Sequence, residues 1–68
     1  MRTNLKLLRV KYGLTQEEMA KRIGVTRTTY CTIENGKSEG GMFFWLGLKK
    51  AFPEIDIHEM TKVEGAEE

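Results

Sequence analysis

The segment Thr15–Gly36, TQEEMAKRIGVTRTTYCTIENG, constrains the fold of this 68-residue chain more than any other stretch. Thr15 and Glu18 have the spacing of a capping box, which predicts that a helix begins here. Gly24 is expected to end that helix, because the turn that follows needs a left-handed backbone. Thr26 is then placed to cap a second helix. The segment therefore predicts two short helices joined by a tight turn.

Each of these two helices has an apolar face that can be buried. Met19, Ala20 and Ile23 recur at helical spacing in the first helix, and Tyr30 and Ile33 do so in the second. We expect the ring of Tyr30 to lie in the core and its hydroxyl to reach the surface. The remaining positions of the second helix would face outward: Arg27, Thr28, Cys31 and Thr32. A small, polar and basic outer face favours a DNA-binding module.

A further helix is predicted before this segment. It would run from residue 4 to about residue 12, with Thr3 or Asn4 as its cap. Leu5, Leu8 and Tyr12 have the spacing of its inner face.

Two more helices are predicted after the segment. One covers about residues 42–52 and ends at Pro53, which cannot continue a helix. The other is short and starts at Asp56, which has capping-box spacing to Glu59. With no strand pattern, the expected fold is all-α, a compact five-helix bundle with the helix-turn-helix at its second and third helices. Residues 1–63 would form this domain, and residues 64–68 an acidic, disordered tail.

The charged residues are unevenly distributed. Residues 1–50 contain ten Lys or Arg and four Asp or Glu, which gives +6. Residues 51–68 contain one Lys and six Asp or Glu, which gives −5 and the overall charge of +1. A basic body is expected of a domain that faces DNA. By itself, the asymmetry fits an ordinary solvated surface with a charged tail equally well.

The composition argues against other classes of protein. One cysteine and one histidine provide neither an internal disulfide nor a zinc finger. They also provide no nucleophile–base set, so we expect no enzyme, no metal and no cofactor. No apolar run is long enough to span a membrane and no signal pattern is present. We therefore expect a cytoplasmic protein, with no membrane partner and no small-molecule ligand.

Several motifs together carry a resemblance to a known family. They are LTQEEMAKRIGV at residues 14–25, IENGK at residues 33–37 and the lead-in LKLLRVKYG at residues 5–13. This combination resembles the lambda-repressor-like helix-turn-helix domain of the Cro/C1 or XRE type, over about residues 4–60. The resemblance implies a sequence-specific regulator of transcription, a small bacterial or phage-type repressor that binds its operator in double-stranded DNA as a homodimer.

The second helix of the motif is expected to contact bases in the major groove. Arg27 can pair with the two acceptors of a guanine edge, although a phosphate contact or a solvated side chain is the alternative. Thr28 and Thr32 can offer a hydroxyl to a base or a methyl group to thymine, or be exposed filler. Cys31 would touch DNA or be a half-buried small side chain.

Other contacts are implied by the resemblance. Gln16 would hold a phosphate at a helix N-terminus, and Asn35 and Lys37 would contact the DNA backbone beyond the second motif helix. Glu39 would repel a phosphate there, whereas the backbone amides of the two glycines that follow it could approach one.

The resemblance also implies a structural ion pair between Arg9 and Glu34, and dimerisation through the C-terminal part of the domain. Residues 42–48 are richer in apolar side chains than one helix face can bury, so one or two of Phe43, Trp45 and Leu46 should be exposed. The expected dimer interface comprises Phe43, Trp45, Phe52, Ile55 and Ile57. The alternative function is a protein-interaction module, antitoxin-like or an adaptor, with the same fold and weak or no DNA binding.

Overall fold

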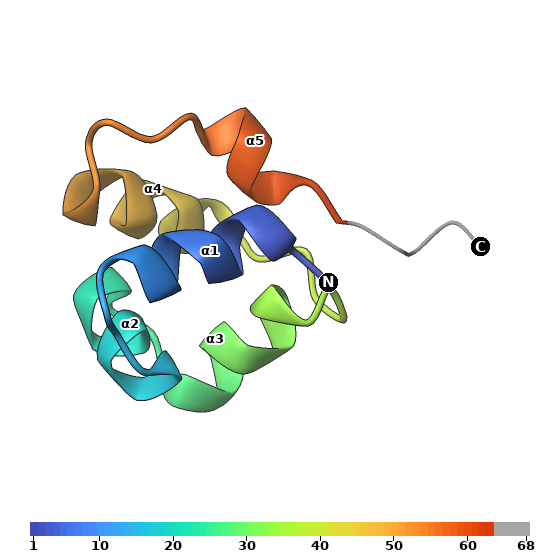
Figure 1. The fold of residues 1–68 in the computed structure, drawn as a ribbon. Helices are drawn as coiled ribbons and strands as arrows, with labels where there is room; N and C mark the ends of the chain where they lie inside the picture. The colour runs from blue at the N-terminus through green and yellow to red at the C-terminus, as the bar shows by residue number, and fades with distance from the viewer. Residues whose placement is uncertain (64–68) are drawn as a thin grey trace.

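The computed structural model describes residues 1–63, and this part of the chain forms five helices and no strand (Figure 1). The helices are α1 (Thr3–Lys11), α2 (Gln16–Ile23), α3 (Arg27–Glu34), α4 (Met42–Ala51) and α5 (Ile57–Thr61). The prediction of an all-α, five-helix fold with its helix-turn-helix at α2 and α3 is confirmed. The tail expected at residues 64–68 lies outside the described residues.

The helices enclose one core. α1 lies between α5 on one side and α3 on the other, and α2 packs against both α3 and α4 (Figure 1). α1 to α4 and the α4–α5 connection all contribute buried apolar side chains, so the core holds the whole domain together. These side chains are Leu5, Leu8, Met19, Ala20, Ile23, Tyr30, Ile33, Phe44, Leu48, Phe52 and Ile55.

The ends of the two motif helices follow from local sequence. Thr15 Oγ1 accepts a hydrogen bond from the Glu18 amide at 3.1 Å, and a Glu18 carboxylate oxygen accepts one from the Thr15 amide at 2.9 Å. Gly24 has a left-handed backbone with φ of 97°, and Thr26 caps α3 by accepting from the Thr29 amide at 3.2 Å. The capping box, the glycine stop and the second cap are all confirmed.

The predicted cap of α1 is wrong. The helix begins at Thr3, and Arg2 occupies the N-cap position without a side-chain cap bond. Asn4 instead donates from Nδ2 to the Glu59 carbonyl at 3.1 Å, because α5 passes close to the start of α1. The amide therefore ties two helices together rather than ending one.

Two further expectations at helix ends need correction. Tyr12 belongs only partly to the inner face. Its ring packs against the buried Phe52, with 4.9 Å between the ring centroids, but the residue is 41% exposed because α1 ends at Lys11, and its hydroxyl donates to Glu54 Oε2 at 2.5 Å. Asp56 does cap α5, but it accepts from the His58 amide at 3.0 Å. The expected reciprocal bond from Glu59 is replaced by an ion pair with Lys62, at 3.3 Å.

α2 and α4 approach so closely that Gly47 has no room for a side chain. A Cβ atom at Gly47 would lie 2.4 Å from the carbonyl oxygen of Ile23 and 3.2 Å from its Cγ2. The obstacle is backbone, which cannot move aside as a flexible side chain could. Gly47 therefore sets the distance between α4 and the end of α2, just before the turn that leads into α3.

Gly47→Ala should destabilise the fold. Glycine in a helix normally costs about 0.5–1 kcal/mol relative to alanine, so this substitution would ordinarily stabilise the protein. Here the methyl group would overpack the contact with Ile23, which typically costs about 1–3 kcal/mol, so the sign of the effect on stability should reverse.

Chemical denaturation measures the free energy of unfolding. Gly41→Ser is the matched control, because a Cβ there has nothing within 4 Å and serine is a favoured N-cap. A Gly47→Ala protein as stable as the wild type would contradict the close approach.

Candidate nucleic-acid interface

α3 buries one face and presents the other to solvent. Tyr30, Ile33 and Glu34 are buried, whereas Arg27 and Thr28 in the first turn are exposed. Because its first turn projects from the body of the domain, α3 offers a charged guanidinium and hydroxyl groups at an accessible end. This is the arrangement expected of the helix that contacts bases.

Thr29 and Thr32 complete the accessible side of α3. Thr29 is exposed in the first turn and accepts a hydrogen bond from the Thr26 hydroxyl at 2.9 Å. Thr32 is half-buried, and its hydroxyl donates to the Thr29 carbonyl at 2.9 Å, which leaves its methyl group and an acceptor for a partner. Sequence analysis missed Thr29 as an exposed residue on this side of α3, although its position directly after Thr28 in the first turn of a short helix was a usable signal.

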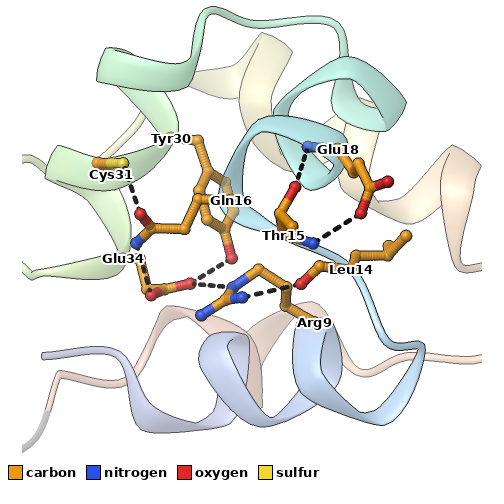
Figure 2. A network of polar contacts seen from close by, with 8 residues as sticks. All are labelled: Arg9, Leu14, Thr15, Gln16, Glu18, Tyr30, Cys31 and Glu34. Carbon is orange, nitrogen blue, oxygen red and sulfur yellow. Dashed lines mark hydrogen bonds and ion pairs between the residues drawn. The ribbon is translucent and has the colours of Figure 1, made fainter.

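The carboxylate of Glu34 joins three helices, as Figure 2 shows. Its Oε1 accepts from Arg9 Nε of α1 at 3.1 Å and from the Tyr30 hydroxyl of α3 at 2.5 Å. Its Oε2 accepts from Gln16 Nε2 of α2 at 3.2 Å. Arg9 also donates from Nη1 to the Leu14 carbonyl at 2.8 Å, which fixes the α1–α2 connection. The structure thus brings Arg9 and Glu34 together, with two further donors on the same carboxylate.

The hydroxyl of Tyr30 does not reach the surface, contrary to the expectation from sequence. Tyr30 is fully buried, and its hydroxyl points to Glu34 (Figure 2). A buried carboxylate needs hydrogen-bond donors, since an unpaired one is strongly destabilising. The tyrosine ring fills core volume while its polar tip satisfies part of that need.

These donors keep Glu34 ionised. Burial raises the pKa of the Glu34 carboxyl, but the hydrogen bonds from Tyr30, Arg9 and Gln16 outweigh it and the pKa lies below its ordinary 4.5. Burial, together with the neighbouring carboxylate, raises the pKa of the Tyr30 hydroxyl. The network therefore holds one negative charge and a protonated tyrosine at neutral pH.

Gln16 and Cys31 connect α2 directly to α3. Cys31 Sγ donates to Gln16 Oε1 at 3.2 Å, while Gln16 Nε2 donates to Glu34 (Figure 2). Both side chains are half-buried. These two bonds hold the Gln16 amide in one orientation. Because an amide nitrogen carries two hydrogens, Gln16 Nε2 can still donate to a second acceptor. Gln16 is the first residue of α2, and the N-terminus of a helix favours a bound anion.

The segment after α3 places Asn35, Lys37 and Glu39 on the surface. Gly36 and Gly40 have positive φ values of 84° and 75°, which let the chain reverse before α4. The amides of Lys37 and Ser38 donate back to the Thr32 carbonyl at 3.0 and 3.3 Å. The exposed Lys37 side chain therefore sits on a short, hydrogen-bonded loop at the opposite end of α3 from Arg27.

The expected dimer residues do not form one surface. Phe43 is 88% exposed, and Trp45 and Ile57 are half-buried against the core. Phe52 and Ile55 are buried, with 2% and 8% of their surfaces exposed, so assigning them to a surface was wrong. The chain turns inward after α4 ends, a long-range feature that hydrophobic spacing cannot reveal. Leu46 and Met42, 54% and 75% exposed, extend the outer apolar face of α4 instead.

Two kinds of feature are absent from the described residues. Within residues 1–63, no three His, Cys, Asp or Glu side chains are grouped so that they could hold a metal ion. In the same part of the chain, no helix combines the length and apolar character needed to cross a membrane.

Tyr30→Phe should weaken the fold in a pH-dependent way. Losing a donor to a buried carboxylate costs about 1–3 kcal/mol at neutral pH. Because the pKa of Glu34 is lowered in the folded state, its contribution is present above pH 4.5 and is lost as the pH falls through the folded pKa. The difference in unfolding free energy between wild type and variant should therefore shrink below about pH 4.5.

Tyr12→Phe is the matched control for this experiment. The Tyr12 hydroxyl also bonds a glutamate, Glu54, but on the surface, so this variant should change stability little at any pH. Denaturant titrations of the three proteins from neutral to acidic pH give the comparison. Parallel curves for the wild type and Tyr30→Phe would contradict the role given to the buried bond.

Comparison with known proteins agrees with this geometry. Residues 5–39, just over half of the chain, match the family model described as "Helix-turn-helix". A protein of Archaeoglobus fulgidus named as an uncharacterized HTH-type transcriptional regulator is 54% identical over 37 residues, which are 54% of this chain and 53% of that protein. The matched part of the chain thus spans about half the length of that relative.

Two relatives match over more of their length. Both are also named as uncharacterized HTH-type transcriptional regulators, from Methanocaldococcus jannaschii and Bacillus subtilis, and they are 38% and 36% identical over 52 residues. In each case the match covers 76% of this chain and 79% of the relative. No solved structure matches the chain significantly. The motif, its geometry and these relatives together show that the chain belongs to the XRE-type helix-turn-helix family.

Proposed function

We propose that this chain is a sequence-specific DNA-binding regulator of transcription. The observation that carries the proposal is the state of α3: its first turn is exposed and polar, while its far end is fixed to α1 and α2 through the buried Glu34 carboxylate. A helix that contacts bases must be both accessible and rigidly oriented, because a small displacement spoils hydrogen bonds to base edges. The names of the relatives support the same function.

Arg27 is the proposed base-contacting residue. It is the first residue of α3 and is exposed, so its planar guanidinium can extend into the major groove and pair with the two acceptors of guanine. Thr28 and Thr32 would add hydroxyl or methyl contacts, and Cys31 would lie at the edge of this surface.

Phosphate contacts on both sides of α3 would set its register on the duplex. Gln16 would donate its remaining amide hydrogen to one phosphate, beside the N-terminus of α2. Asn35 and Lys37 would contact the backbone at the other end of the helix. Residues from both ends of the motif would therefore straddle the groove that α3 occupies.

We further propose that the protein acts as a homodimer. A dimer would place two copies of α3 in successive major grooves, about 34–36 Å apart, and block a promoter by occupying it. In this proposal the protein is a repressor without catalytic activity that works in the cytoplasm, on the nucleoid.

The outer face of α4 is the proposed dimer surface, and a second copy is its occupant. Phe43, Leu46 and Lys50 follow one another at helical spacing along this face. They border a groove of about 580 Å³ that is also lined by Ile23, Gly47, Lys49 and Pro53. An exposed phenylalanine next to a groove on the same molecule can pack into the groove of a second copy, with Phe43 as the protruding side chain.

The pattern on α4 is complementary to itself. In a twofold dimer each surface patch meets the same patch of the partner, so two α4 helices would cross in opposite directions. Phe43 at one end would then face Lys50 of the second copy at the other end, with Leu46 between them. An ammonium group over an aromatic ring is favourable, by about 0.5–1 kcal/mol even at exposed sites.

The alternative is a protein-interaction module with the same fold. The exposure of Phe43, Leu46 and Met42 on α4 favours it, because a contiguous apolar surface is typical of a protein interface. The two functions differ in salt dependence: DNA binding through phosphates weakens steeply as salt is raised, whereas contact with an apolar surface does not.

Selection of bound duplexes from a random DNA library, followed by sequencing, tests the proposed function. Enrichment of an inverted repeat with half-sites one helical turn apart is the expected result. A single enriched half-site would retain DNA recognition but exclude the dimer. Absence of enrichment at low salt would exclude the proposed function and leave the interaction module.

Arg27→Ala should relax the base preference at one position of each half-site. Loss of a bidentate guanine contact costs about 1–3 kcal/mol of discrimination. Repeating the selection with the variant measures this change. Arg22→Ala is the matched control, since Arg22 is also an exposed arginine, at the end of α2, and it should leave base preference unchanged. If Arg27→Ala weakened binding to all sequences alike, Arg27 would contact phosphate rather than a base.

Phe43→Ser should shift the protein from dimer to monomer. The change removes the protruding ring of the proposed interface from a position that contributes nothing to the core, so the fold should be unaffected. Sedimentation equilibrium at several concentrations measures the association. Leu7→Ser, at a 58% exposed position of α1, is the control and should still dimerise. A wild-type protein that is monomeric both free and on DNA would contradict the α4 interface.

A further inference from the structure

Arg2 is the buried cation of the described chain, only 3% exposed. Its backbone amide donates to the Glu34 carbonyl at 2.8 Å. Its Nη1 donates to the carbonyls of Ile33 at 2.6 Å and Ser38 at 2.7 Å. One side chain near the start of the chain thus holds the last turn of α3 and the loop that follows it.

Further contacts surround the same guanidinium. Nε donates to the Thr61 carbonyl of α5 at 3.2 Å, and Nη2 reaches the Glu39 carbonyl at 3.5 Å. The guanidinium carbon lies 5.6 Å from the ring centroid of Trp45 in α4, within the range of a cation–π contact. Arg2 therefore contacts α3, the α3–α4 loop, α4 and α5 at once.

The position of Arg2 suits the electrostatics of α3. The last carbonyls of a helix have no partner inside it and carry partial negative charge. α3 has no basic residue in its own last turn, and Arg2 supplies the cation from a distant part of the sequence. Burial lowers the pKa of Arg2, and the negative charge of Glu39 partly opposes that lowering.

The bonds to Ser38 and Glu39 also orient two peptide groups. No peptide bond among the described residues is cis, and in a trans peptide the N–H points opposite to the carbonyl. The Ser38 and Glu39 carbonyls point inward, to Arg2, and Trp45 Nε1 donates to the Glu39 carbonyl as well, at 3.2 Å. The amides of Glu39 and Gly40 therefore point away from Arg2. The Gly40 amide donates to Ser38 Oγ at 3.4 Å, so the Glu39 amide is the one left for a partner.

We propose that Arg2 is a positioning residue for DNA binding: by holding the Ser38 and Glu39 carbonyls inward, it presents the Glu39 amide beside Lys37 as a contact for a DNA phosphate. This inference rests on the proposed function. An outward backbone amide next to a lysine attracts an anion. The loop can then bind phosphate although its sequence, Ser-Glu-Gly-Gly, is poor in basic residues.

Amide chemical shifts of the wild-type protein give the first test. The probe is one DNA duplex of arbitrary sequence at low salt, since phosphate contacts do not depend on sequence. A downfield shift of the Glu39 amide, together with shifts along α3, is the expected result. Shifts along α3 without one at Glu39 would overturn this inference alone. A spectrum unchanged throughout would overturn the proposed function.

Arg2→Lys gives the second test. Lysine keeps the charge but lacks the planar fork that reaches several carbonyls at once. Released from Arg2, the loop should withdraw the Lys37 ammonium and the Glu39 amide from the phosphate. Because the slope of log affinity against log salt reflects the phosphates that Lys and Arg neutralise, loss of the Lys37 contact should lower that slope by about one. The base preference found by selection should not change. Affinity is measured for the same duplex at a temperature where circular dichroism shows the variant folded.

Asn4→Ala is the matched control. It removes the hydrogen bond from Asn4 to Glu59, another link between the start of the chain and α5, without touching the loop after α3. Because Asn4→Ala should lower stability without changing the loop, its salt slope should equal that of the wild type. A wild-type slope for folded Arg2→Lys would overturn the positioning role. If Arg2→Lys does not fold, the amide shifts of the wild-type protein decide whether the loop contacts a phosphate.

Discussion

The orientation of α3 depends on one buried carboxylate. Glu34 accepts hydrogen bonds from Arg9, Gln16 and Tyr30, so α1, α2 and α3 meet at a single charge. A helix that must leave its outer side free for DNA cannot be covered by apolar neighbours all round. Directional hydrogen bonds to the buried Glu34 carboxylate replace part of the missing apolar contacts. They fix the rotation of α3 about its own axis as well as its distance from α1 and α2.

Both charged residues buried in the described chain, Glu34 and Arg2, lie at the same end of α3. Glu34 belongs to the last turn, and Arg2 satisfies the carbonyls that this turn exposes. The opposite end, which begins with Arg27, is held only by its Thr26 cap and the apolar face of the helix. The fold therefore anchors α3 at its C-terminal end and projects its N-terminal end, as a helix that inserts into a groove requires.

Sequence patterns predicted the features that depend on neighbouring residues. The Thr15 and Glu18 capping box, the stop at Gly24 and the apolar stripes of α2 and α3 are local, so spacing alone reveals them. The roles of Arg2 and of the Tyr30 hydroxyl were out of reach for a different reason. Arg2 meets Thr61 across 59 residues, and an arginine just before a helix has the same local pattern whether it is buried or solvated.

α4 shows why an apolar run does not identify an interface. Phe44 and Leu48 are buried on its inner side, where Gly47 brings the helix against the Ile23 backbone, while the outer side is apolar too. Within residues 1–63 no further element covers that side. Phe52 was assigned to the surface because spacing carries no information about where the chain turns after a helix. Since burying a phenylalanine typically stabilises a protein by about 1.5–3 kcal/mol, the exposed Phe43 ring leaves a comparable free energy available to whichever surface covers it.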